Sequence, residues 1–212
     1  MVGRAGLTVD GWGTTMPGMT GLLDRVAAFA TSRMGLVAAG VWGLAEAIVL
    51  PVVPDVLLYL LAAAAPARAP RLFVAAIVGA LTGTVVLYAL ATWDLDAARA
   101  LVLAVPGIGP SMLATATATV DSGDPVSMAL FGPGTPLKVY TVGWASGAGS
   151  VAGLLVGAIL NRLTRIGPGL LVAMVVGALV PGLLRRWERI GLVAYLIGWS
   201  VVYAAYLLSQ PA

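Results

Sequence analysis

Two carboxylates, Glu46 and Asp55, lie within one apolar stretch of the chain, EAIVLPVVPD. An ionisable side chain at membrane depth costs roughly 2.5–3.5 kcal/mol, so it needs a charged partner or a water-filled cavity. In one continuous helix the two acids would lie on opposite faces. Pro51 and Pro54 should break the helix near Leu50 and let both acids turn to one side. A broken helix with acids at its break is typical of a membrane binding site, and a kinked spanning helix with structural polar contacts is the alternative.

A second apolar stretch contains the segment FGPGTPLK, which ends at Lys138. Pro133 and Pro136 repeat the spacing of the first pair of prolines, again with a charged residue just after them. Gly132 and Gly134 allow close backbone approaches that suit a loop held inside protein. Two broken segments in corresponding positions predict a degenerate internal repeat with a transporter site at the repeat interface. A Gly/Pro loop whose lysine reaches the headgroups is the alternative.

A cation at one break and acids at the other predict a specific chemistry. Lys138 could hold a phosphate as a point charge, assisted by the positively polarised N-termini of half-helices. Glu46 and Asp55 could change protonation during a transport cycle. We therefore expect Lys138, Gly132 and Gly134 to bind an anionic head group, and the two acids to couple its release to proton uptake.

Composition sets the class of protein. Of the 212 residues, 60% are hydrophobic and 10% are charged, and the mean hydropathy is +0.99, which is too apolar for a soluble domain of this length. We expect an all-α polytopic membrane protein whose partners are membrane lipids and protons, not nucleic acid. The absence of His and Cys excludes disulfides, thiol chemistry and imidazole or thiolate metal sites, and no cofactor is expected.

The apolar runs predict the order of the elements that position these residues. The chain should contain a flexible tail over 1–19, an interfacial amphipathic helix over 20–33, a membrane domain over 34–165 and two transmembrane helices within 166–212. Within the membrane domain we expect hairpins over about 34–65 and 126–147, and spanning helices over about 72–93 and 148–162. The second spanning helix should end at a membrane edge marked by Asn161, Arg162 and Arg165.

Paired glycines at GxxxG spacing occur in both expected spanning helices, at Gly79/Gly83 and Gly153/Gly157. Such pairs let another helix approach closely, either within one chain or in a homodimer. Orientation stays open because arginines flank both ends of one expected span, with a preference for a cytoplasmic N-terminus.

The order of these features resembles the DedA family, also described as VTT or SNARE-associated membrane proteins. The resemblance covers roughly 34–165 and rests on the acid followed by PVVPD, the Gly-rich helix, the FGPGTPLK segment and the paired arginines. It implies two inverted repeats, each a re-entrant hairpin plus a spanning helix, with the hairpin tips meeting near the bilayer centre. It also implies a protein of the bacterial cytoplasmic membrane that moves phospholipids or polyprenyl phosphates between leaflets, with Glu46 and Asp55 as its membrane acids. The chain has Leu130 and Pro136 where many bacterial members have arginine, which leaves Lys138 as the nearby cation.

Three other functions stay open. A small-molecule exporter would share the expected site. A non-transporting assembly or envelope-integrity protein would use Glu46, Asp55 and Lys138 as a structural ion-pair network. An intramembrane hydrolase would use the two acids as a carboxylate pair, but the sequence offers no water access or scissile-substrate site, so we do not expect an enzyme.

Overall fold

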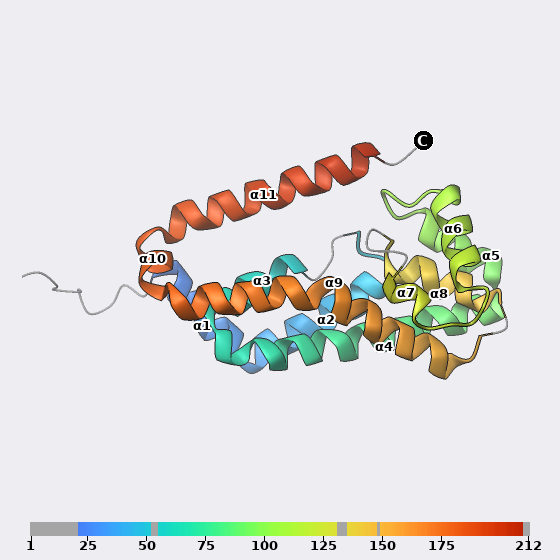
Figure 1. The fold of residues 1–212 in the computed structure, drawn as a ribbon, viewed down its shortest axis with the longest axis horizontal. Coiled ribbons are helices and arrows are strands. Elements are labelled where there is room, and N and C mark those ends of the chain that lie inside the picture. Colours follow the sequence, from blue (N-terminus) through green and yellow to red (C-terminus); the bar gives the residue numbers. More distant parts are fainter. Residues whose placement is uncertain (1–20, 52–54, 131–134, 148, 210–212) are drawn as a thin grey trace, which may run out of the picture.

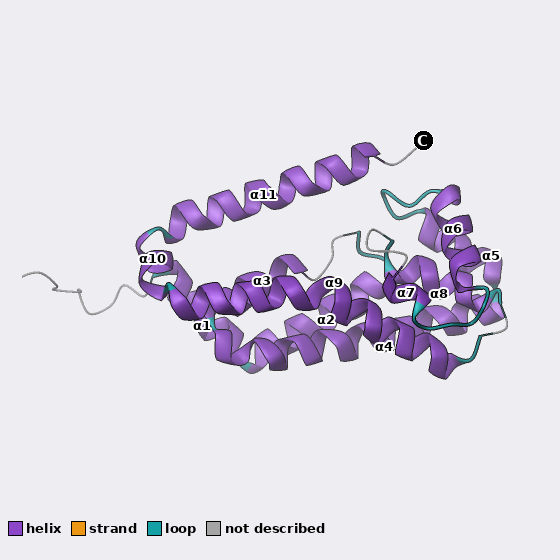
Figure 2. Ribbon diagram, viewed as in Figure 1, coloured by secondary structure: helices purple, strands orange, loops and turns teal. Residues whose placement is uncertain are grey.

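The structure is a computed structural model that describes residues 21–51, 55–130, 135–147 and 149–209. Helices account for 85% of these residues and no β-strand occurs among them, which confirms the predicted all-α class (Figure 2). The predicted tail over 1–19 lies outside the described residues.

The described helices follow one another along the chain as labelled in Figure 1. They are α1 (Leu22–Thr31), α2 (Arg33–Ile48), α3 (Asp55–Ala64), the 3-10 helix η1 (Pro66–Arg68), α4 (Ala69–Trp93), α5 (Leu95–Leu103), α6 (Pro110–Val120), α7 (Ser127–Leu130), α8 (Leu137–Ala145), α9 (Val151–Leu179), α10 (Pro181–Arg186) and α11 (Glu188–Ser209).

Within the described residues, three helical segments have the length and apolar composition of membrane spans: Pro66–Trp93, Val151–Leu179 and Glu188–Leu208. Helices α1 and α2 would together make a fourth, but they meet at an angle of 79°. Ser32 lies at this bend, and its hydroxyl accepts a hydrogen bond of 3.1 Å from the Gly35 amide, which caps α2. The described chain is therefore suited to integral membrane location.

One predicted boundary is wrong. The sequence placed a helix end at Asn161 and a new span from Ile166, whereas α9 runs without interruption from Val151 to Leu179. Arg165 is the midpoint of this helix, with fourteen residues on either side. The residues that predicted a membrane edge therefore lie in the middle of a long apolar helix, where Asn161 and Arg162 are buried and Arg165 is partly buried.

The first broken segment lies between α2 and α3. Helix α2 ends at Ile48 and α3 begins at Asp55, so the helix is interrupted in the interval that contains Pro51 and Pro54. Leu58 and Leu61 of α3 belong to the same hydrophobic cluster as Ala30 of α1, so α3 returns to the end of the bundle from which α2 starts. Helices α2 and α3 therefore form a helical hairpin.

The second broken segment approaches from the other end. Leu137 and Val139 of α8 share a hydrophobic cluster with residues of α5 and α6, and that cluster also contains Ala158 of α9. Ile166 of α9 belongs instead to the cluster around α1 and α3. Two apolar cores thus occupy the two ends of the bundle, and the part of α9 between Ala158 and Ile166 joins them.

Glycines explain how closely α2 and α4 pack. A Cβ atom on Gly79 of α4 would collide with the carbonyl oxygen of Gly40 on α2, and one on Gly43 would collide with the carbonyl oxygen of Ala76. A Cβ on Gly83 would approach the Leu44 carbonyl oxygen to 2.6 Å. The GxxxG pair of α4 therefore serves contact within the chain.

Helix α11 lies along one side of the bundle and has no buried side chain among its described residues (Figure 1). Hydrogen bonds attach it along its length: the Leu23 amide donates to Glu188 Oε2 over 3.0 Å, and the Tyr195 hydroxyl donates to the Val56 carbonyl over 2.7 Å. Near the far end, the Tyr206 hydroxyl donates to the Gly107 carbonyl over 3.1 Å. The helix is held by polar contacts and aromatic side chains and not by a continuous packed face.

Candidate functional site

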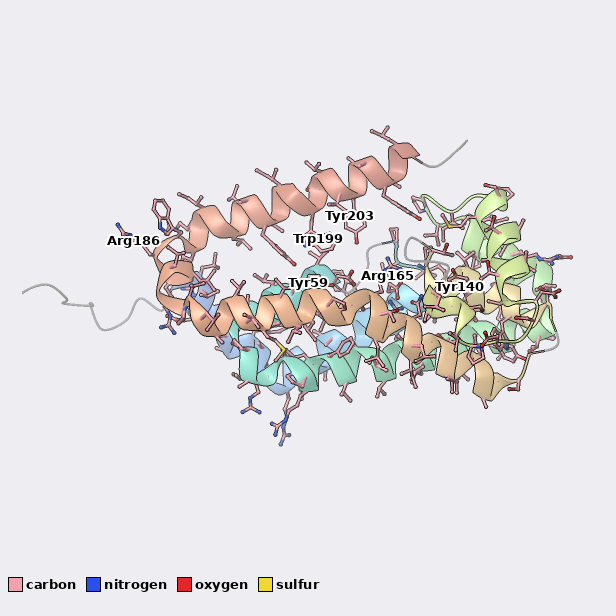
Figure 3. All side chains as sticks on the ribbon, in the orientation of Figure 1. Tyr59, Tyr140, Arg165, Arg186, Trp199 and Tyr203 are labelled. Atoms are coloured by element: carbon pink, nitrogen blue, oxygen red, sulfur yellow. The ribbon has the colours of Figure 1, made fainter. Side chains whose placement is uncertain are left out.

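Charged side chains from four helices gather where the two hydrophobic cores meet. Glu46 of α2, Lys138 of α8 and Arg162 of α9 are each 1% exposed, and Asp55 of α3 is 6% exposed. Arg165, one helical turn beyond Arg162, is partly buried and lies on the inner side of α9 (Figure 3). Both predicted acids and the predicted lysine are thus brought into one cluster.

Glu46 and Arg162 form a buried ion pair between Glu46 Oε2 and Arg162 Nη2. The two residues are 116 positions apart in the sequence. Two ions are expensive to remove from water, and their attraction compensates only when the pairing is close. This contact ties the first hairpin to the middle of α9.

Lys138 joins the two broken segments to each other. Its Nζ donates a hydrogen bond of 2.8 Å to the carbonyl oxygen of Leu50, which lies just beyond the end of α2. A carbonyl at a helix end lacks an intrahelical donor, so the ammonium group satisfies it. The lysine also interacts electrostatically with Glu46.

Asn161 makes the matching connection to the second hairpin. Its Nδ2 donates a hydrogen bond of 2.8 Å to the Met128 carbonyl oxygen of α7. Because Asn161 and Arg162 are adjacent, one turn of α9 holds α7 through the amide and α2 through the guanidinium. Helices α2 and α7 are therefore held by the same turn of α9.

A cavity of about 330 Å³ opens beside this cluster. Asp55, Lys138 and Arg165 contribute its charged lining, and Pro51 and Pro136 come from the two broken segments. Its remaining walls are Val105, Pro106 and Ile108 from the loop after α5, and Trp199, Val202, Tyr203 and Tyr206 from α11. Its volume lies within the range of small-molecule sites, about 300–1,000 Å³.

Several hydrogen-bonding atoms of the cluster have no hydrogen-bond partner among the described residues. They include the donors Arg162 Nε, Arg162 Nη1 and Arg165 Nη1, and the acceptors Glu46 Oε1 and Asp55 Oδ1. The cluster contains three cationic side chains, Lys138, Arg162 and Arg165, and two acidic ones. Its formal net charge is therefore +1. Such a cluster has both the charge and the free N–H groups to bind a small anion.

The predicted site residues have different outcomes. Glu46, Asp55 and Lys138 lie together, and Pro51 and Pro136 line the cavity. Lys138 lines the cavity but directs its Nζ to a backbone carbonyl, so it has a tethering role that the sequence did not predict. The remaining predicted residues lie outside the described part of the chain: Gly132, Gly134, Pro54 and Pro133.

Sequence reasoning missed Asn161, Arg162 and Arg165 as site residues because it read them as a helix end. A signal was present: the two arginines are separated by three positions, which places them on one face of a helix, and no proline or glycine occurs between them and Ala158. An unbroken apolar helix with one polar face predicts interior charges as readily as a membrane edge.

In the part of the chain that the structure describes, no group of three or more carboxylates could hold a metal ion. Comparisons with family models, with curated proteins and with solved structures found no match.

Proposed function

We propose that the protein is a membrane carrier for anionic lipid phosphates, which it moves between the two leaflets. The observation that carries the proposal is the buried cluster of net charge +1, in which Arg162 and Arg165 keep N–H groups without an acceptor among the described residues. A bound phosphate would supply those acceptors and neutralise the excess charge. Guanidinium groups suit this role because their planar donors match phosphate oxygens in pairs.

The arrangement of the hairpins supports alternating access to the site. Helices α2 and α3 form a hairpin from one end of the bundle, and α7 and α8 approach from the other end. Each hairpin is followed by a long helix, α4 or α9. We interpret these as two inverted repeats that meet at the charged cluster, an organisation that agrees with the resemblance to the DedA family.

Proton coupling would act through the acids. In the absence of substrate, Arg162 is neutralised by Glu46. An arriving phosphate would compete with Glu46 for this guanidinium, and a displaced, poorly solvated carboxylate would take up a proton. Asp55, which interacts electrostatically with Arg165 and Arg162, would respond in the same way. Proton uptake would therefore accompany substrate binding, and not substrate release as expected from the sequence.

The test is a leaflet-transfer assay in proteoliposomes with a fluorescent lipid phosphate, run with and without a proton gradient. Unaltered protein should accelerate transfer, and the gradient should change the rate. Glu46→Gln should remove the response to the gradient. Gradient-dependent transfer that persists in folded Glu46→Gln protein would contradict the coupling proposal, and no transfer above empty liposomes would contradict the carrier proposal.

The buried Glu46–Arg162 pair also favours a second function, a non-transporting membrane assembly protein in which the cluster is structural. A buried ion pair can often be replaced by well-packed apolar residues without loss of stability. Under this second proposal the double variant Glu46→Leu, Arg162→Leu keeps its cellular function. Under the carrier proposal the same variant folds and loses transfer.

A further inference from the structure

A second cavity, of about 700 Å³, lies beneath α11 on the side of the bundle formed by α1, α3 and α9. Apolar side chains form nearly all of its lining, among them Val26, Leu60, Ala173, Val176, Leu184 and Leu192. Glu188, at the start of α11, is the one acidic or basic residue among those that line it. We call this cavity the apolar groove.

Aromatic side chains connect the apolar groove to the charged cavity. Tyr59 and Tyr195 line the groove, and Trp199 and Tyr203 line the charged cavity. The ring centroid of Trp199 lies 6.2 Å from that of Tyr59, 6.3 Å from that of Tyr195 and 5.9 Å from that of Tyr203. Figure 3 places Tyr59, Trp199 and Tyr203 in the space between α3 and α11. One aromatic wall thus runs from the apolar groove to Arg165.

We propose that the apolar groove binds the hydrocarbon tail of the lipid whose phosphate occupies the charged cavity. This inference rests on the proposed function, and it assigns the tail to a site inside the protein and not to the surrounding bilayer. An apolar groove that adjoins a small cationic cavity across a cluster of aromatic side chains matches the two parts of an anionic amphiphile. A free phosphate or a small polar solute would use the charged cavity and leave the groove without a role.

The attachment of α11 fits this assignment. Its contacts to the bundle include the hydrogen bonds of Glu188, Tyr195 and Tyr206, and none of its described side chains is buried. The apolar groove lies under the part of α11 from Glu188 to Tyr195, and the charged cavity lies under the part from Trp199 to Tyr206. A tail in the apolar groove would lie against α9 on one side and α11 on the other.

Two glycines of α11 give a matched pair of variants. Gly191 lines the apolar groove, and an added Cβ there would meet no atom within 4 Å. Gly198 is equally open to an added Cβ but lines neither cavity. Gly191→Phe should therefore place a ring in or over the groove, while Gly198→Phe makes the same change of residue type elsewhere on the helix.

The test uses dodecyl phosphate with a photoactivatable diazirine at the end of its chain, and dodecanol with the same diazirine as the probe without a phosphate. Both probes label lipid-facing surfaces, so the measured quantity is the preference of the phosphate probe for peptides that line the groove, such as the one containing Ala173 and Val176. We expect this preference in the unaltered protein and in Gly198→Phe, and its loss in Gly191→Phe and in Arg165→Gln.

Equal groove labelling by the two probes would overturn the tail site. If Arg165-dependent transfer of lipid phosphate is still observed in the leaflet assay, the proposed function stands while this inference fails. If transfer does not depend on Arg165, the proposed function itself fails. Mapping in the unaltered protein needs no substitution, so the inference remains testable even if Gly191→Phe does not fold.

Discussion

Lys138 of α8 donates a hydrogen bond to the carbonyl oxygen of Leu50, and this contact joins the two broken segments of the chain over an Nζ–O distance of 2.8 Å. The lysine is 1% exposed, so the contact is made inside the bundle. Its partner lies where α2 has ended, at a point where the backbone needs a donor from elsewhere.

Lys138→Met should therefore destabilise the protein. Loss of the ammonium leaves a carbonyl of the first break without its donor, at a cost of about 1–3 kcal/mol. We expect a lower midpoint of thermal unfolding in detergent. Arg99→Met is the control, because Arg99 is exposed and its ion pair with Asp96, at 3.6 Å, contributes little. Equal midpoints for both variants would show that the tether does not stabilise the fold.

Because Glu46 and Arg162 form a buried ion pair, we expect the effects of substituting them on stability to be non-additive. Glu46→Leu alone leaves Arg162 buried without its partner, and breaking a buried pair in this way costs about 3–5 kcal/mol. The double variant Glu46→Leu, Arg162→Leu should recover most of that loss. A double-mutant cycle of unfolding midpoints measures the coupling. Additive effects would contradict a direct interaction between the two side chains.

Because α2 packs closely on α4, we expect that replacing Gly79 with a larger residue destabilises the protein. Gly79→Ala places a Cβ against the Gly40 carbonyl and should destabilise the protein by about 1–3 kcal/mol through a forced backbone shift. The same change at Gly198, which is open on all sides, should be neutral or stabilising because alanine favours a helix. A fall in unfolding midpoint for Gly198→Ala as large as that for Gly79→Ala would contradict this account.

The sequence predicted the helical class and several helix limits because those depend on local patterns. The apolar run after Arg71 gave the long helix α4, and the two prolines of the first break gave the interruption between Ile48 and Asp55. The prediction failed at α9, because Asn161, Arg162 and Arg165 form a polar group of the kind that is expected at a membrane edge.

The partners of the buried charges could not be predicted, because they come from distant parts of the chain. Glu46 meets Arg162 across 116 positions, and Lys138 meets Leu50 across 88. A single sequence gives the cost of each buried charge but not the residue that offsets it. The sequence therefore identified both acids and the lysine as site residues and assigned the arginines to a surface.

Burial of the two arginines of α9 also removes the conflict over orientation. Among the described cations outside the charged cluster, seven arginines belong to elements at the end of the bundle formed by α1, η1 and α10 (Figure 1). They are Arg25, Arg33, Arg68, Arg71, Arg185, Arg186 and Arg189. The opposite end has Arg99 together with Asp94, Asp96, Asp121 and Asp124. The arginine-rich end should face the cytoplasm.

Cysteine labelling tests this orientation without background labelling of the chain itself, because the chain has no native cysteine. Gly182→Cys places a thiol at the arginine-rich end, and Ser122→Cys places one at the opposite end, both at exposed positions. In intact cells a membrane-impermeant maleimide should label Ser122→Cys, and it should label Gly182→Cys only after permeabilisation. The reverse pattern would invert the orientation.

Arg165 is the residue on which the proposed anion site most depends, since it lines the charged cavity and has a buried Nη1 with no acceptor among the described residues. The most direct measurement compares Arg165→Gln with Arg99→Gln in the leaflet-transfer assay, with both proteins shown to be folded. We expect Arg165→Gln to lose transfer of lipid phosphate and Arg99→Gln to keep it. Equal transfer by both variants would contradict an anion site at the junction of the two hairpins.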